Sequence, residues 1–425
     1  MTTVLIILVF VLGYIAIAFE HPLKLNKAAS ALITGVLCWT IYILQSESGE
    51  TVSEELLHHL GEIASILFFL LGAMTIVELI DTHNGFDIIT QKIKTSSKSK
   101  LLIIITVLTF FLSALLDNLT TAIVMSSLVT KLLVDKEHKL WFCGMIVIAA
   151  NAGGAWSPLG DVTTTMLWIG GQITALNIMK QLILPSIAVC LFPAIIVAYK
   201  FRGAKFNPIP ESTATYKQKA DSRIVLFSGI GFLIFVPIFK TVTHLPPFMG
   251  MMLALGLMWV ITTVIHKNKR PEIYEKLTVA KALQKVDTPS ILFFLGILLA
   301  VSALQSFGLL KEMADFLSNN LKNDYLIGTA LGLLSAVVDN VPLVAASQGM
   351  YDLSTYPTDH PFWEFLALTT GTGGSAIIIG SAAGVAVMGI QQIDFMWYLK
   401  KISWLALIGF AAGIGVFLLQ VWLIG

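Results

Sequence analysis

The chain has 425 residues, of which 56% are hydrophobic and only 12% are charged. A soluble domain carries about twice that share of charged residues, so the composition excludes a water-soluble protein. Apolar runs of about 20 residues recur from end to end, enough to cross a hydrocarbon core of roughly 30 Å. The net charge of +1 gives no indication of a nucleic-acid partner. The composition therefore predicts an all-α polytopic membrane protein.

The apolar runs define the expected spans in chain order. No basic residue precedes the first run, 4–19, so we expect a retained span rather than a cleaved signal peptide. Ordinary spans are expected next at 28–45, 63–80, 181–199, 224–241, 247–266, 289–305 and 402–424. The three cysteines all lie in apolar runs, with no disulfide or metal-ligand spacing. We expect no resident cofactor.

Four further runs are interrupted by polar or glycine-rich sequence. Asp-Asn interrupts 101–134 and 325–350, which we predict to be re-entrant hairpins, whereas glycines interrupt 141–170 and 362–390, which we predict to be broken helices. This arrangement places most of the 27 basic residues on one side of the membrane, as the positive-inside rule requires. The sequence therefore predicts about ten crossings plus two hairpins, with both chain ends outside.

The two halves of the chain resemble each other at a spacing of about 220 residues. The sequence SILFF at 65–69 recurs at 290–294, SALLDN at 113–118 recurs as SAVVDN at 335–340, and the glycine pair at 153–154 recurs at 373–374. We predict a first repeat at 1–200, a cytoplasmic linker at 201–223 and a second repeat at 224–425. Five crossings per half make the repeats inverted, as in secondary transporters. No ATP-binding motif is present.

Carboxylates at the predicted hairpin tips are the first candidate ion ligands. Asp117-Asn118 and Asp339-Asn340 occupy these tips. A carboxylate at membrane depth costs several kcal/mol, so it should face a cavity, a cation or a proton. Oxygen ligands of this kind suit a hard cation such as Na⁺. The alternative is a structural role, in which each Asp only caps the helix that follows.

The glycine-rich stretch of the first repeat contains a third carboxylate. Asn151 opens this stretch, and Ser157-Pro158 is expected to restart the helix, with Asp161 in its opening turn and Thr164 one turn later. A purely structural Asp161 at the helix dipole is the alternative. In the second repeat Thr372 and Ser375 supply only neutral oxygens, so we expect cation binding to be lopsided toward the first repeat.

Two acids at the ends of spans are candidate proton carriers. Glu78 follows an apolar run, and Asp287 lies beside Lys285. The alternative for each is a solvated charge at a helix end. No Arg or Lys lies near either hairpin tip in the sequence.

These motifs resemble the ion transporter superfamily and, within it, the NhaD-type sodium/proton antiporters. The resemblance rests on SALLDNLTTAIV at 113–124, NAGGAWSPLGDVTTTMLW at 151–168, SAVVDNVP at 335–342 and GTGGSA at 371–376, and it covers essentially the whole chain. It implies exchange of Na⁺ or Li⁺ for H⁺, a homodimer in the bacterial inner membrane, and an elevator-like motion. The positions it implies as important are Ser113, Asp117, Asn118, Asn151, Asp161, Thr163, Thr164, Ser335, Asp339, Asn340 and Ser375.

Two relatives in the same superfamily and two other classes compete with this interpretation. A sodium-coupled carboxylate symporter is the runner-up, although the Asp residues at the tips would repel an anionic substrate, and an arsenite exporter is a second relative. An intramembrane aspartyl protease is rejected because the pair Tyr351-Asp352 falls at the end of a span, so no enzyme activity is predicted. A channel is disfavoured by the inverted repeats. The favoured mechanism is competition of one cation with protons for Asp117 and Asp339, assisted by Asp161.

Overall fold

The computed structural model describes residues 2–424 apart from 19–24, 47, 87, 89–94, 206–215, 268–276 and 338. The first half contains α1 (Thr2–Ala18), α3 (Lys27–Gln45), α4 (Gly49–Thr82), α6 (Lys98–Leu116), α7 (Asn118–Leu132), α8 (Lys136–Ala155), α9 (Val162–Ile169) and α10 (Ala175–Lys200). Eight of the described helices are long and apolar enough to cross a membrane. The predicted all-α polytopic class is confirmed.

The second half continues with the same kinds of element. It contains α11 (Tyr216–Thr243), α12 (Pro247–His266), α14 (Val279–Leu283), α15 (Thr288–Ser306), α16 (Leu309–Leu321), α17 (Asp324–Leu334), α18 (Asn340–Met350), α19 (Pro361–Gly373), the short 3₁₀ turns η1 (Gly374–Ala376) and η2 (Ile378–Gly380), α20 (Ala382–Gln391), α21 (Phe395–Lys401) and α22 (Ser403–Ile424). Residues 206–215 of the predicted linker at 201–223 lie outside the described residues, whereas 216–223 are already part of α11, so the linker is shorter than predicted. The division into two inverted repeats stays a prediction.

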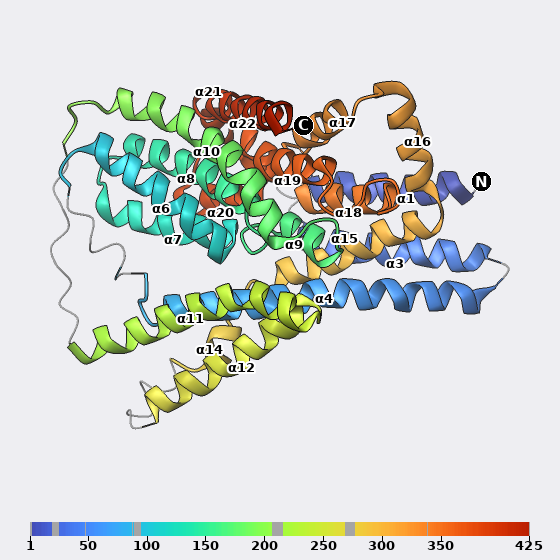
Figure 1. Ribbon diagram of the computed structural model, residues 1–425, viewed down its shortest axis with the longest axis horizontal. Coiled ribbons are helices and arrows are strands. Elements are labelled where there is room, and N and C mark those ends of the chain that lie inside the picture. The colour runs from blue at the N-terminus through green and yellow to red at the C-terminus, as the bar shows by residue number, and fades with distance from the viewer. Residues whose placement is uncertain are drawn as a thin grey trace.

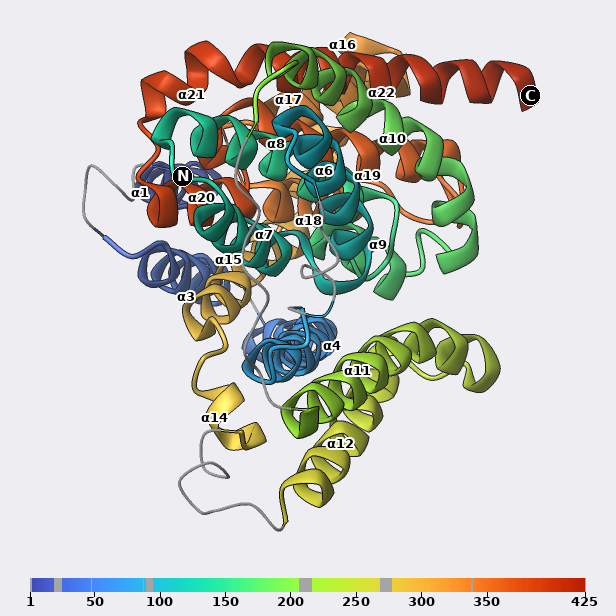
Figure 2. The ribbon, with the colours of Figure 1, turned by 90° about the vertical axis from the view of Figure 1, so that its left-hand side faces the viewer.

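Helix contacts divide the molecule into two groups, and Figures 1 and 2 show where their members lie. We call α6 to α10 and α17 to α22 the site group, because they pack on one another and contain all four interrupted runs. We call α1, α3, α4, α11, α12, α14 and α15 the support group. Contacts of α15 with α18, and of α4 with α9, join the two groups, and α16 packs against helices of both.

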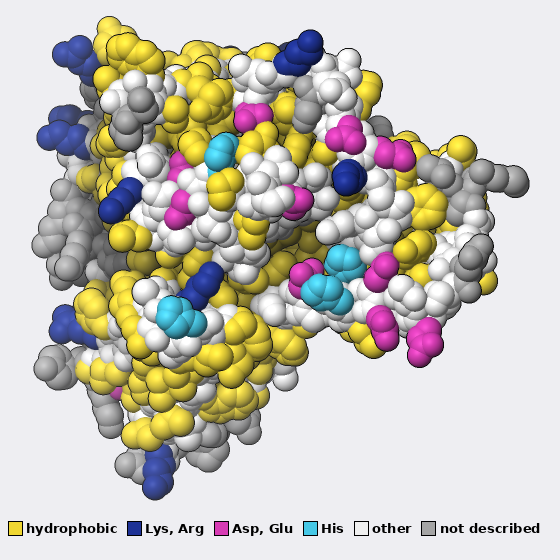
Figure 3. All heavy atoms as spheres, turned by 45° about the vertical axis from the view of Figure 1, so that its right-hand side comes forward, with side chains coloured by type: hydrophobic (Ala, Val, Ile, Leu, Met, Phe, Trp, Pro, Cys, Tyr) yellow, Lys and Arg dark blue, Asp and Glu magenta, His cyan; other side chains and the backbone are white. Residues whose placement is uncertain are grey.

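Side-chain charge is distributed unevenly between the two ends of the helices. On the face drawn in Figure 3, several Lys and Arg side chains gather along the left edge, and a group of Asp and Glu side chains lies at the right. The helices run roughly between these two ends in Figure 1. This distribution agrees with the predicted topology, in which basic loops share one side of the membrane.

All four predicted interruptions of helical structure are present. The first helix pair, α6 and α7, breaks at Asp117, and the second pair, α17 and α18, breaks between Ser335 and Asp339. The first broken helix is α8 and α9, and the second is α19, η1, η2 and α20. One prediction is wrong in detail: Ser157-Pro158 lies in a turn, and the helix restarts at Val162 with Asp161 as its N-cap.

The repeated glycines explain how each broken helix packs on its helix pair. A Cβ atom at Gly153 would overlap the carbonyl oxygen of Phe110 in α6, and one at Gly373 would overlap the carbonyl oxygen of Gly332 in α17. Only glycine allows backbones to approach so closely. The same backbone contact therefore occurs at equivalent positions of the two halves.

We predict that Gly373→Ala destabilises the protein by about 1–3 kcal/mol, because the added methyl group meets backbone that cannot move aside cheaply. The measurement is the midpoint temperature for loss of the monodisperse peak in detergent. Gly256→Ala is the matched control, since a Cβ there has no atom within 4 Å. Equal midpoints for the two variants would contradict the close-packing argument.

Candidate ion-binding site

The carboxylate of Asp161 lies at the centre of the site and is only 2% exposed. Its Oδ1 accepts hydrogen bonds from the backbone N–H of Thr163 at 2.9 Å and from the Thr163 hydroxyl at 2.8 Å. Its Oδ2 accepts from Nδ2 of Asn118 at 2.9 Å. Nδ2 of Asn340 lies 3.5 Å from both oxygens. Residues from α7 and α18 therefore meet at one carboxylate.

Asn151 links this carboxylate cluster to the second broken helix. Its Oδ1 accepts from Nδ2 of Asn118 at 3.1 Å. Its Nδ2 donates to the hydroxyls of Ser375 and Ser381, each at 2.9 Å. All these side chains are buried. The network thus joins both helix pairs and both broken helices, and it includes Ser381, which was not among the predicted site residues.

The two tip carboxylates have separate local partners. Asp117 accepts from the N–H of Thr120 at 2.7 Å and from its hydroxyl at 2.8 Å. Its φ of 75° and ψ of 156° fall in a region that is nearly reserved for glycine and costs about 1–3 kcal/mol. Asp339 accepts from the N–H of Val341 at 3.2 Å. Both lie close enough to Asp161 for electrostatic interaction.

Lys27 lies beside the second hairpin tip, although no Arg or Lys is near either tip in the sequence. Its Nζ lies 3.6 Å from Oδ2 of Asp339. Lys27 is the first residue of α3 and is more than 300 residues away in the sequence. The contact could not be predicted from the sequence, because it joins two residues that are far apart in the chain and no local pattern indicates it.

Two predicted serines attach the helix pairs to the broken helices. The Ser113 hydroxyl donates to the carbonyl oxygen of Ala150 at 2.6 Å, and that of Ser335 donates to the carbonyl oxygen of Thr370 at 3.1 Å. Both hydroxyls therefore donate to the backbone of a broken helix, and their role as supporting polar residues of an ion site stays a prediction.

The remaining predicted residues do not join the Asp161 network. The hydroxyl of Thr164 donates to the carbonyl oxygen of Ala155 at 3.4 Å, and that of Thr372 donates to the carbonyl oxygen of Leu368 within its own helix. Glu78 forms an ion pair with Lys285 at 2.8 Å. Asp287 caps α15 through Ser290. Their roles as oxygen ligands or proton carriers stay predictions.

Glu364 is a buried acid that sequence reasoning missed. It lies in the first turn of α19, is 3% exposed and accepts a hydrogen bond from Nδ2 of Asn177 in α10. Glu364 is the one acidic residue within the predicted broken span 362–390, and this isolated position in an apolar run could have indicated a buried carboxylate. Its contacts attach α19 to α10 at a distance from the Asp161 network along the helix.

The four helices that restart after the interruptions have polar caps. Asp117, Asp161 and Asp339 cap α7, α9 and α18, and each accepts from a backbone N–H of its helix. Ser381 caps α20 through the N–H of Gly384. A helix N-terminus is partly positive and favours an anion. Here covalently attached carboxylates already occupy three of the four positions.

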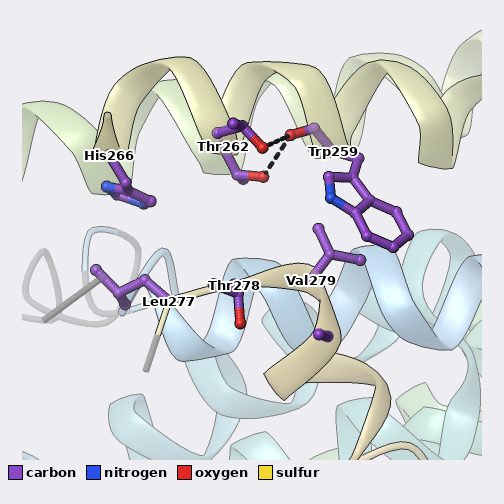
Figure 4. Close-up of a pocket in the computed structure, with 8 residues that line it drawn as sticks. Trp259, Thr262, His266, Leu277, Thr278 and Val279 are labelled. Carbon is purple, nitrogen blue, oxygen red and sulfur yellow. Dashed lines mark hydrogen bonds between the residues drawn. The ribbon is translucent and has the colours of Figure 1, made fainter. Parts of the chain in front are cut away.

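A separate cavity of about 200 Å³ lies between α12 and the segment around α14 (Figure 4). Trp259, Thr262, His266 and Val279 are among its lining residues. The described residues that line it include no carboxylate and none of the predicted ion ligands. This cavity is therefore a feature of the support group and not part of the ion site.

Comparison with known proteins places the chain in a family of transporters. The family described as citrate transporter matches residues 14–371. Sodium/proton antiporter 2 of Arabidopsis thaliana is 45% identical over 97% of this chain and 98% of its own length. Sodium/proton antiporter 1 of the same plant is 47% identical over 97% of this chain and 71% of its own length.

A bacterial relative extends the comparison. The Na⁺/H⁺ antiporter NhaD of Vibrio cholerae is 32% identical over 97% of this chain and 91% of its own length. The resemblance to the ion transporter superfamily and its NhaD-type members is thereby confirmed. Together with the apolar helices, these matches show that the chain is a multi-pass membrane protein that belongs to the citrate transporter family.

Proposed function

We propose that the protein is a secondary antiporter that exchanges Na⁺ or Li⁺ for H⁺. The observation that carries this proposal is the Asp161 carboxylate, which is 2% exposed and surrounded by amide and hydroxyl groups of both helix pairs and one broken helix. The side-chain oxygens of Asn118, Asn151 and Asn340 can turn toward a cation, because an amide offers an acceptor as well as donors. Relatives that are named sodium/proton antiporters support the same conclusion.

Competition between one cation and protons would couple the two fluxes. Hard cations of this kind bind oxygen ligands. The single negative charge of a carboxylate can be neutralised by a proton or can attract a cation, but it cannot do both at once. We propose Asp161 as the main cation ligand, with Asp117, Asn118, Asp339 and Asn340 completing the site as it reorganises. This assigns more weight to Asp161 than the sequence-based mechanism did, because the amides of Asn118 and Asn340, one from each helix pair, approach its carboxylate.

The transport step is proposed to be an elevator-like movement of the site group against the support group. Both helix pairs and both broken helices belong to one packed group, so they can move as a unit. A charged, empty site would oppose that movement across a hydrocarbon core, whereas a neutralised site would not. We also propose a homodimer in the bacterial inner membrane without a resident cofactor.

A sodium-coupled carboxylate symporter is the second candidate function. The description of the matching family favours it. The three Asp caps oppose it, since they place negative charge where helix N-termini would otherwise attract an anionic substrate. An experiment can distinguish the two functions, because an antiporter should respond to Na⁺ or Li⁺ alone and a symporter to a carboxylate substrate.

We predict that adding Na⁺ or Li⁺ to the purified protein in weakly buffered detergent solution releases protons, because the cation displaces them from a shared carboxylate. The measurement is the change in pH after addition of each chloride salt, with choline chloride as the control for ionic strength. Proton release with citrate or succinate but not with Li⁺ would instead favour the symporter.

We predict that Asp161→Asn, Asp117→Asn and Asp339→Asn each abolish Na⁺-dependent pH changes in everted vesicles while the protein still inserts. Replacing a carboxylate by an amide removes the charge but retains the cap, so the loss should exceed about a hundredfold for Asp161. Asp315→Asn on the exposed surface of α16 is the matched control and should exchange normally. Full exchange by any of the three variants would remove that residue from the mechanism.

We predict that Asn151→Ala raises the KM for Na⁺ about tenfold and lowers thermal stability, because the buried hydroxyls of Ser375 and Ser381 and the amide of Asn118 lose a shared partner. Transport in proteoliposomes and the melting midpoint provide the two readouts. Asn320→Ala, on the exposed part of α16, is the control. An unchanged KM would show that the network does not shape the cation site.

A further inference from the structure

The two helix pairs hold their tip carboxylates in different ways. In the first pair, Thr120 satisfies Asp117 with both its N–H and its hydroxyl. The repeated motif aligns Thr120 with Pro342, which follows Asp339 by the same three positions. Proline has neither a backbone N–H nor a hydroxyl. The second tip therefore cannot form either of the contacts that hold the first.

Lys27 supplies a partner for the second tip from outside its helix pair. Its Nζ lies 3.6 Å from Oδ2 of Asp339, with 23% and 17% of the two side chains exposed. The same Nζ lies 4.5 Å from the centre of the Phe293 ring, a cation–π contact. The ammonium group is therefore held between a carboxylate and an aromatic face.

The backbone beneath Lys27 is held rigidly. Asn26 caps α3 by accepting from the N–H of Ala28. A Cβ at Gly296 of α15 would overlap the backbone of Ala31, so α3 and α15 are in direct backbone contact. Lys27 and Phe293 thus belong to one packed unit of the support group.

The ion pair crosses the boundary between the two groups. Lys27 belongs to α3 in the support group, whereas Asp339 caps α18 in the site group. The corresponding second span of the other half, α12, opens with the uncharged residues Pro247 to Gly250. A lysine at this place is therefore present in one half of the molecule only.

We propose that Lys27 is a positioning residue for Asp339: its ammonium group acts as a tethered cation that holds the second tip against α3 and keeps the transported cation at Asp161. This inference rests on the proposed antiport function. While Lys27 is paired with Asp339, its ammonium group would repel a mobile cation near that carboxylate. The pair also has to separate whenever the site group moves away from α3.

The test compares Lys27→Met and Lys27→Gln with the wild-type protein. Removing the ammonium group leaves the site more negative, so Na⁺ should bind about tenfold more tightly, and turnover should fall because release becomes slower. Calorimetric titration with NaCl gives the affinity, and proteoliposomes give KM and kcat. Lys27→Arg keeps the charge and should retain the wild-type affinity.

Lys200→Met is the matched control. Lys200 forms the same two kinds of contact, an ion pair with Glu137 at 3.9 Å and a cation–π contact with Trp141 at 3.6 Å, but it lies at the end of α10. Its Na⁺ affinity should remain that of the wild type. An affinity for Lys27→Met that is unchanged or weaker than in the wild type would overturn the proposal.

A charge exchange separates this proposal from the proposed function. Lys27→Asp and Asp339→Lys should each lower the melting midpoint, and the two together should recover most of the loss if the side chains pair. This readout needs no transport. A wild-type protein that shows no response to Na⁺ or Li⁺ would refute the antiport function, whereas absence of recovery in the double variant would refute the pairing.

Discussion

Burial of the Asp161 carboxylate is the constraint on which the rest of the site depends. A charge that is 2% exposed requires compensation, since transfer out of water costs several kcal/mol. The compensation comes from the first turn of α9 and from the amide of Asn118. The backbone N–H of Thr163 is available to the carboxylate because the helix stops at Ala155 and restarts at Val162. The interruption of the helix and the ion site are therefore one structural feature.

Close packing of backbone keeps the interrupted helices in place. Irregular backbone at membrane depth is tolerated only where protein or a water-lined cavity satisfies it. Gly153 and Gly373 let each broken helix touch its helix pair, and Ser113 and Ser335 add hydrogen bonds beside those contacts. A side chain at either glycine would move the helices apart and would separate the Asp161 network.

The two halves share a framework but differ in charge. Asp161 of the first half corresponds to the neutral Ser381 of the second. Asn151 donates to Ser381 and is linked to Asp161 through Asn118, whose Nδ2 donates to both Asn151 and Asp161. Lys27 of the first half lies beside Asp339 of the second, whereas Asp117 accepts hydrogen bonds from Thr120 of its own helix. A symmetric framework with asymmetric charge gives one cation a preferred position, because the ammonium group of Lys27 offsets the charge of Asp339 and would repel a cation there.

The sequence alone determined the helical class, the four interruptions and most of the polar residues around them. Apolar run length, glycine pairs and the repeated Asp-Asn motif are local properties, so they can be read without coordinates. The tertiary structure decided that Asp161 is the central carboxylate and that Thr120 and Lys27 are the partners of Asp117 and Asp339. Lys27 reaches Asp339, and Asn151 reaches Ser381, across more than 200 residues. Such contacts depend on how helices pack, and no periodicity within a single helix encodes them.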